Sequence, residues 1–184
     1  MVVEVLDRSR QIYLWSGSIA ELEADVIVNA ANRSLLGGGG VDGVIHRAAG
    51  PALLGACKEL NGCEAGQAKA TPAFNLSARY VIHTVGPIWR KGDDAEIALL
   101  ASCYAQSLKL AADLNCCSIA FPALSTGAYG FPQDVAARTA IKTVSEMLGS
   151  YPQLDVTLVS YPARNQRHLI NAAKALGVSC SIKS

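Results

Sequence analysis

Four short segments of the sequence are apolar almost without interruption, and they limit the chain to a small set of folds. These segments lie at 26–29, 80–85, 117–121 and 154–160. Strands with one face in water alternate apolar and polar residues, whereas nearly continuous apolar strands are covered on both faces. Longer stretches with helical periodicity separate the four runs. We therefore expect an α/β fold in which a central sheet lies between two layers of helices.

Three further extended runs stand near the ends of the sequence, at 2–6, 10–15 and 178–182. A polar segment from Asp7 to Arg10 separates the first two. That segment predicts a turn, so the two runs are expected to form an antiparallel hairpin at an edge of the sheet. The third run predicts a final strand.

Glycine, proline and aspartate residues mark where the helices should begin and end. Gly50 should end one helix and Pro51 begin the next, because proline suits the first turn of a helix and glycine its C-terminus. Asp93 or Asp94 should cap a longer helix. The helix capped by Asp93 or Asp94 is expected to end at 114. Two later helices are expected, one from 132 to about 148 and one from about 165 to 176. With no linker or repeat in between, residues 1–184 are predicted to form one domain.

The charges are balanced, which restricts the partners that the chain can bind. Of its 184 residues 17% are charged, and the formal net charge is +1. This excludes the broad basic field of a general nucleic-acid binder, so any anion must be bound locally. No run approaches the roughly 20 apolar residues of a membrane span, and the N-terminal residues do not resemble a secretory signal. We expect a cytoplasmic protein that does not associate with membranes.

Six cysteines are present, but their pattern does not indicate a disulfide framework or a metal site. There is no C-x-x-C pair, and the three histidines are scattered along the chain. Without a secretory signal, such cysteines are expected to stay reduced and to pack as small apolar side chains. We predict no structural metal and no cofactor.

A glycine-rich segment follows the apolar run at 26–29. Gly37 to Gly40 are four consecutive glycines, placed just before a helical pattern that starts near Val44. Glycine in regular structure costs about 1 kcal/mol relative to alanine, so such a run suits a backbone that adopts unusual angles or approaches a ligand closely. A turn between a strand and a helix presents free N–H groups and the positive end of the helix dipole, which favour a phosphate. A flexible surface loop is the alternative.

A second loop of the same kind follows the run at 117–121. It reads Leu124-Ser-Thr-Gly-Ala-Tyr-Gly-Phe-Pro132 and again precedes a helix. In open α/β sheets, ligands bind at the carboxyl ends of the strands. Two such loops at one edge can hold a diphosphate between them, while Tyr129 and Phe131 offer flat apolar surface.

Better known phosphate motifs do not account for these loops. The P-loop pattern G-x-x-x-x-G-K-[ST] is absent. Gly38-x-Gly40-x-x-Gly43 matches the dinucleotide pattern G-x-G-x-x-G, but the intervening residues from Asn32 to Gly37 separate it from its strand. A run of four glycines also satisfies that pattern by chance, which disfavours a dinucleotide dehydrogenase.

Several blocks of the sequence together resemble the macrodomain family, in its branch of ADP-ribosyl and O-acetyl-ADP-ribose hydrolases. The blocks are DVIVNAAN at 25–32, LGGGGVDG at 36–43, IHRAAGP at 45–51, VIHTVGP at 81–87 and FPALSTGAYGFP at 121–132. They follow the expected order and cover most of the chain. The resemblance implies a three-layer α/β/α domain with a mixed, mostly parallel sheet of about six strands, which binds ADP-ribose at the carboxyl edge of the sheet.

The resemblance also assigns roles to individual residues. Asn32 would hydrogen-bond ribose hydroxyls, and Asp42 would orient or deprotonate a water for attack at an acyl carbonyl or at the anomeric carbon of the distal ribose. The alternative for Asp42 is that it only caps the following helix. The residues expected to contact the ligand are Ser18, Ile19, Gly38, Gly39, Gly40, Val41, Ser125, Thr126, Gly127, Ala128, Tyr129 and Tyr161.

The end of the site that would hold adenine departs from the family pattern. The family usually has Gly-Asp-Ile, whose aspartate accepts a hydrogen bond from the adenine amino group, where this chain has Gly17-Ser18-Ile19. A serine oxygen can still accept that bond, but it loses charge assistance worth about 1 kcal/mol. Tyr161 resembles the family's aromatic residue beside the adenine, and packing at the end of its strand is the alternative.

The sequence suggests three functions. The first is a hydrolase that removes acetyl groups from O-acetyl-ADP-ribose, or mono-ADP-ribose from acidic side chains of proteins. The second is a non-catalytic module that binds ADP-ribose on proteins, which the presence of both Asn32 and Asp42 disfavours. The third is a regulator of an RNA-processing partner, and no stripe of aromatic and basic residues supports contact with a nucleic acid.

Overall fold

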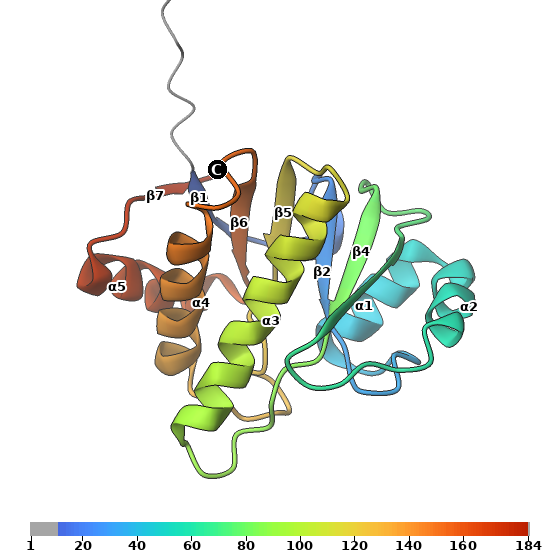
Figure 1. Cartoon of the computed structure of the whole chain (residues 1–184), viewed down its shortest axis with the longest axis horizontal. Coiled ribbons are helices and arrows are strands. Elements are labelled where there is room, and N and C mark those ends of the chain that lie inside the picture. The colour runs from blue at the N-terminus through green and yellow to red at the C-terminus, as the bar shows by residue number, and fades with distance from the viewer. Residues whose placement is uncertain (1–10, 184) are drawn as a thin grey trace, which may run out of the picture.

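The computed structural model describes residues 11–183, and seven strands within them form one sheet (Figure 1). The strands are β1 (Ile12–Ser16), β2 (Val26–Ala30), β3 (Ala68–Pro72), β4 (Tyr80–Thr84), β5 (Ser118–Phe121), β6 (Asp155–Ser160) and β7 (Cys180–Ile182). They lie in the order β3-β4-β2-β5-β6-β1-β7. The pair of β3 and β4 is antiparallel, and the other neighbouring pairs are parallel. The expected mixed, mostly parallel sheet is confirmed, with seven described strands in place of about six.

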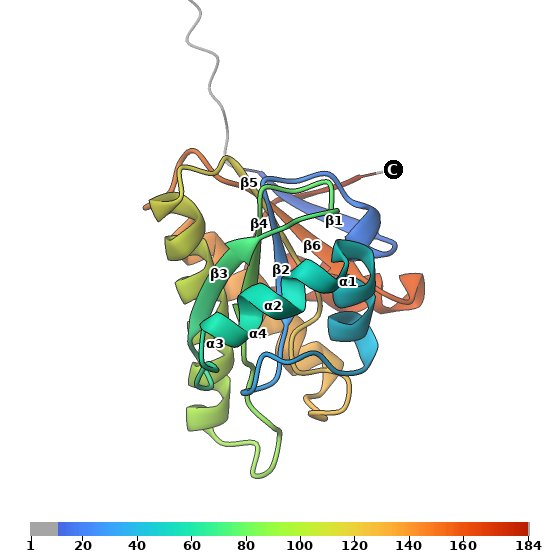
Figure 2. The same ribbon diagram turned by 90° about the vertical axis from the view of Figure 1, so that its right-hand side faces the viewer.

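Helices cover both faces of this sheet, as Figure 2 shows from the side. They are α1 (Gly40–Ala49), α2 (Pro51–Glu59), α3 (Asp94–Asp113), α4 (Gln133–Met147) and α5 (Gln166–Leu176). The helices α1 and α2 pack on one face, whereas α3, α4 and α5 lie on the other. The expected three-layer α/β/α architecture is therefore confirmed.

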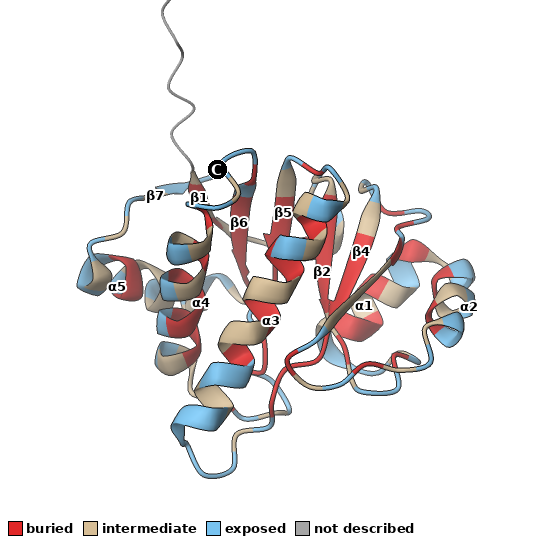
Figure 3. Ribbon diagram, viewed as in Figure 1, coloured by how far each residue is buried: buried red, intermediate tan, exposed pale blue. Residues whose placement is uncertain are grey.

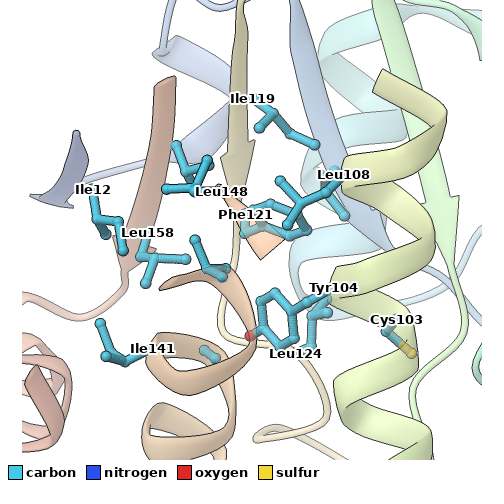
Figure 4. Packing of buried hydrophobic residues seen from close by; sticks show 14 of the residues in the cluster. Ile12, Cys103, Tyr104, Leu108, Ile119, Phe121, Leu124, Ile141, Leu148 and Leu158 are labelled. Carbon is cyan, nitrogen blue, oxygen red and sulfur yellow. The ribbon is translucent and has the colours of Figure 1, made fainter. Parts of the chain in front are cut away.

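Each face of the sheet has its own apolar core. Phe121 of β5 packs against Tyr104 of α3 with ring centroids 5.0 Å apart, in the core beneath α3 and α4 (Figure 4). Adjacent residues of β4 point to opposite cores, because Ile82 belongs to this one and Val81 to the core beneath α1 and α2. Buried residues accordingly fill the central strands and the inner faces of the helices (Figure 3). This explains why the central strands are apolar without alternation.

Most of the predicted helix boundaries are confirmed, but α1 begins at Gly40, four residues before the expected start near Val44. The Asp93 side chain accepts a hydrogen bond from the Glu96 backbone N–H at 3.1 Å, which caps α3. Gly50, with a φ of 84°, separates α1 from α2, and α2 starts at Pro51. Helix α4 begins directly after Pro132.

The predicted hairpin is wrong in its placement of the segment at 10–15. Residues 12–15 of this segment belong to β1, which lies inside the sheet with β6 on one side and β7 on the other, both parallel to it. Its two sides are therefore occupied by strands from the far end of the sequence. The other predicted half of the hairpin, at 2–6, lies outside the described residues. Strand β3 was not predicted.

The parallel pairing of β2 and β4 brings two polar residues together in the centre of the sheet. Asn29 lies directly opposite His83, and both side chains are fully buried. Since Val28 points into the core beneath α3, its neighbour Asn29 points to the face that carries α1. The strands thus place a buried amide and a buried imidazole beneath the start of α1.

Three further observations bear on the expectations from composition. Within residues 11–183, no helix combines the length and apolar character needed to cross a membrane. All six cysteines carry free thiols. No group of three or more histidine, cysteine, aspartate or glutamate side chains is arranged to hold a metal ion among the residues that the structure describes.

Candidate functional site

A cleft of about 720 Å³ opens at the carboxyl edge of the sheet. The segments that follow β1, β2, β4, β5 and β6 form its walls. Its volume lies within the range of about 300 to 1,000 Å³ that is typical of small-molecule sites. The carboxyl ends of the parallel strands therefore meet at one recess, as the sequence predicted.

The residues selected from the sequence all line this cleft. The structure brings together Asn32 and Asp42 with Ser18, Ile19, Gly38, Gly39, Gly40, Val41, Ser125, Thr126, Gly127, Ala128, Tyr129 and Tyr161. Their functions in binding or catalysis remain predictions. What the geometry establishes is that both glycine-rich loops face the same space.

The first loop connects β2 to α1 and presents open backbone to the cleft. Gly39 precedes the first turn of α1 and caps it without any side chain. A Cβ atom on Gly39 or Gly40 would have no neighbour within 4 Å. Gly43 shows the opposite situation, because a Cβ there would lie 2.6 Å from the carbonyl oxygen of Gly38. The loop thus folds tightly against α1 and leaves the first N–H groups of that helix directed at the recess.

Asp42 lies in the first turn of α1 and is only 5% exposed. Its Oδ1 accepts a hydrogen bond of 2.7 Å from the Asn29 side-chain amide. His46 Nε2, one turn later on the same helix, lies 3.4 Å from that oxygen. The alternative that Asp42 is the N-cap is wrong, since Gly39 occupies that position. The Asn29 side chain of β2 thus holds the Asp42 carboxylate from the side of the sheet.

The other carboxylate oxygen of Asp42 faces the glycine loop and Asn32. A Cβ built on Gly38 would lie 3.1 Å from Asp42 Oδ2 and 3.4 Å from Asn32 Nδ2, so both atoms border the same small space. Asn32 Nδ2 donates one hydrogen bond to the carbonyl of Gly37 at 2.9 Å. An amide nitrogen carries two donors, which leaves the second free for a ligand.

The second loop connects β5 to α4 and is held in a compact turn. Ser125 has a φ of 62°, and its carbonyl accepts a bond of 3.0 Å from the N–H of Phe131. The Ser125 hydroxyl is buried and has no hydrogen-bond partner among the described residues. A Cβ on Gly86 would overlap that hydroxyl, so the segment after β4 packs directly on this loop. Residues of this turn border the cleft, whereas the Ser125 hydroxyl is buried against Gly86.

The segment after β4 also supports the second loop from outside. The N–H of Trp89 donates to the carbonyl of Tyr129 at 2.8 Å, and the Trp89 ring meets Phe131 edge-on with centroids 4.5 Å apart. Glu96 of α3 accepts hydrogen bonds from three successive backbone N–H groups of this segment, at 90–92. The position of Tyr129 is therefore fixed by contacts behind it.

The ends of β1 and β6 form the far end of the cleft. Ser18 precedes a short 3-10 helix (Ile19–Glu21), and its hydroxyl makes no capping bond to that helix. The N–H of Gly17 donates to the carbonyl of Ser160 at 3.2 Å, which links the two strand ends. Tyr161 is 77% exposed, so the alternative that it packs against the end of its strand is wrong. Its ring is free to cover a flat ligand.

Three polar residues around Asp42 were not identified from the sequence. Asn29 stands at the start of the first candidate segment, and His46 and His83 stand in blocks that resemble the family, but the sequence assigned a role to none of the three. Burial lowers the pKa of His83 to about 4, and the nearby His46 adds to this effect. The spacing of four residues between Asp42 and His46 on one helix could have indicated their contact. Contact between Asn29 and Asp42 depends on the way α1 crosses β2, which the sequence does not reveal.

Comparisons with known proteins agree with this architecture. The chain matches the family model described as Macro domain over residues 28–140, more than half of its length. An O-acetyl-ADP-ribose deacetylase of Cronobacter sakazakii is 51% identical over 162 residues, which cover 85% of this chain and 90% of that protein. The ADP-ribose glycohydrolase MACROD2 of Mus musculus is 56% identical over 148 residues, covering 79% of this chain and 31% of that protein. Among solved structures, a variant of the Oceanobacillus iheyensis macrodomain with ADPR has a TM-score of 0.85 and 41% identity, and the match covers 89% of this chain and 91% of that one.

Proposed function

This chain belongs to the macrodomain family, and on that premise we propose that it binds ADP-ribose and hydrolyses an ester at the distal ribose. The observation that carries the proposal is the meeting of three features in one cleft. These are the open start of α1, the turn at 125–129 and the buried carboxylate of Asp42. Relatives named as hydrolases of ADP-ribose derivatives support the same reaction class.

The two loops suit the pyrophosphate of ADP-ribose. The first N–H groups of α1 lack partners within the helix, and the helix dipole places partial positive charge there. The turn at 125–129 adds backbone donors from the opposite wall. Adenine would then lie toward Ser18, Ile19 and Tyr161, and the distal ribose toward Asn32 and Asp42.

Asp42 is the group that we assign to the chemical step. Its carboxylate would orient a water molecule and take a proton from it as the water oxygen attacks the acyl carbon. The bond between the acyl carbon and the ribose oxygen breaks, and the ribose oxygen is protonated to a hydroxyl. The products are a carboxylic acid and ADP-ribose. O-acetyl-ADP-ribose and ADP-ribosylated acidic side chains both carry such an ester, so one site can serve both.

Exchange of Asp42 tests this assignment. We expect Asp42→Ala to lower hydrolysis of O-acetyl-ADP-ribose and of mono-ADP-ribosylated protein by roughly 100-fold or more, the size of a lost general base. Its dissociation constant for ADP-ribose, measured by calorimetry, should stay within a few-fold of wild type. Asp134→Ala is a matched control, because Asp134 also lies in the first turn of a helix but outside the cleft.

Two results would contradict the proposal. Equal loss of binding and turnover in Asp42→Ala would mean that Asp42 is structural. A wild-type protein that binds ADP-ribose but releases no product from either substrate would be the non-catalytic reader. We also propose that the protein acts in the cytoplasm, a reducing compartment in which its six free thiols would persist.

A further inference from the structure

A row of buried polar side chains extends from Asp42 through the sheet. The Asn29 amide nitrogen donates to Asp42 Oδ1 at 2.7 Å and contacts His83 Nδ1 at 3.1 Å. On the far side of the imidazole, His83 Nε2 lies 3.0 Å from Thr71 Oγ1. None of the four residues is more than 5% exposed. The row therefore joins α1, β2, β4 and β3 beneath the floor of the cleft.

The direction of these hydrogen bonds is fixed by the chemistry of the groups. The side-chain nitrogen of Asn29 can only donate, so His83 Nδ1 must accept and its proton must sit on Nε2. From Nε2 that proton points to Thr71. Because burial lowers the pKa of His83 to about 4, the ring is neutral near pH 7 and Nδ1 stays available as an acceptor. Cys57, 3.6 Å from Nε2, stays a thiol, since burial, with the charge of Asp42 next, raises its pKa to about 11.

The backbone does not need this row, since the ladder bonds of β2 and β4 form without it. Polar groups in such a place are costly unless each is paired. The row nevertheless has one clear mechanical effect, because Asn29 anchors a single oxygen of the Asp42 carboxylate. His46 is close to the same oxygen, but its Nε2 makes no hydrogen bond among the described residues. Rotation of the carboxylate is therefore restrained by Asn29, and Oδ2 stays directed toward Gly38 and Asn32.

We propose that Asn29 and His83 are positioning residues for the hydrolytic reaction: Asn29 holds Oδ1 of Asp42, and His83 holds the Asn29 amide in the orientation that does so. The inference rests on the proposed function, because it explains how the carboxylate is kept ready to act on water. Neither side chain lines the cleft. Both should affect the chemical step and leave binding of ADP-ribose nearly unchanged.

Exchange of Asn29 is the first test. We expect Asn29→Ala to lower kcat for O-acetyl-ADP-ribose roughly 10-fold to 100-fold, the range for loss of a hydrogen bond to a charged group. KM and the dissociation constant of ADP-ribose should change less than about threefold if ground-state binding is untouched. Ser107→Ala is the matched control, because it also removes a fully buried side-chain hydrogen bond, 2.7 Å to the carbonyl of Cys103, in the opposite core. Its kcat should equal that of wild type.

A pair of His83 variants separates positioning from general support of the fold. His83→Leu fills similar space without an acceptor, whereas the carbonyl oxygen of His83→Asn can take the place of Nδ1. We expect His83→Leu to lose kcat about as much as Asn29→Ala and His83→Asn to recover part of it. The double variant Asn29→Ala/His83→Leu should be no slower than Asn29→Ala, because the two residues act through one contact. In ¹⁵N spectra of the wild type, His83 should show the Nε2-protonated neutral ring at pH 7.

The outcomes distinguish this inference from the proposed function. Wild-type turnover together with unchanged kcat in Asn29→Ala would overturn the positioning role alone. Equal kcat in His83→Leu and His83→Asn, or an Nδ1-protonated ring, would overturn the part assigned to His83. Absence of turnover in the wild type would refute the hydrolase, and the positioning role with it.

Discussion

Acidification should destabilise this protein through His83. The imidazole is fully buried, and burial, with His46 as a second cause, lowers its pKa from 6.5 to about 4. In the unfolded chain the ring is in water and binds a proton near its ordinary pKa of about 6.5. Between about pH 6.5 and pH 4 the unfolded state therefore binds more protons than the folded state. The contribution of His83 to stability is fully present above this window and is lost as the pH falls through it.

The size of the effect follows from the two pKa values. The free energy of unfolding should fall by about 2 kcal/mol between pH 8 and pH 5, and by about 3 kcal/mol below pH 4, through this group alone. Carboxylates add their own dependence at low pH, so the change must be measured against a variant without the imidazole. His83→Asn is suitable because it keeps an acceptor for Asn29 but does not titrate.

Urea unfolding followed by tryptophan fluorescence at pH 8, 7, 6 and 5 measures this difference. His83→Asn leaves a cavity and should be less stable than wild type at pH 8. The gap between the two proteins should then narrow by about 2 kcal/mol on going to pH 5, because only in the wild type does the unfolded chain bind a proton at position 83 that the folded protein does not bind. Parallel stability curves for the two proteins would refute the reasoning, as would a gap that widens toward acid.

Two further predictions concern the walls of the cleft. Ser18→Asp should tighten ADP-ribose binding about fivefold, the equivalent of about 1 kcal/mol from a charged acceptor for the adenine amino group; unchanged or weaker binding by calorimetry would count against the adenine assignment. Gly86→Ala should lower the free energy of unfolding by about 1 to 3 kcal/mol, because its Cβ overlaps the buried Ser125 hydroxyl, and it should weaken ADP-ribose binding as the second loop shifts. The control is Gly127→Ala, whose Cβ has no neighbour within 4 Å, and its melting temperature should equal that of wild type. A Gly86→Ala protein as stable as this control would show that the contact between Gly86 and Ser125 is not tight.

The layers and most helix boundaries could be predicted because they depend on local signals. Continuous apolar strands require cover on both faces, and Gly50, Pro51 and Asp93 act within one turn of where they stand. The antiparallel edge strand β3 carried no such signal, since only one of its five residues is buried. The place of β1 could not be predicted either. Its neighbours β6 and β7 come from the other end of the sequence, whereas the hairpin was inferred from residues next to it.

The cleft could also be predicted from local signals, but the contact between Asn29 and His83 beneath it could not. Glycine-rich turns after parallel strands must meet at one edge, so their residues could be selected without coordinates. Asn29 and His83 are 54 residues apart and become partners only through the register of β2 and β4. A single polar residue within an apolar strand gives no sign of its role until its partner on the adjacent strand is known. The exposure of Tyr161 likewise depends on how the chain turns after β6.

Because Asn29 pairs with His83, the support beneath Asp42 forms only when β2 and β4 pair in the correct register. If β2 slipped by one residue against β4, every side chain of β2 would change faces. The amide would enter the hydrocarbon interior beneath α3, and a valine would stand under Asp42 in its place. A mispaired molecule would thus be both unstable and inert. Insertions or deletions of one residue within β2 should therefore never yield a folded protein that has merely lost its activity.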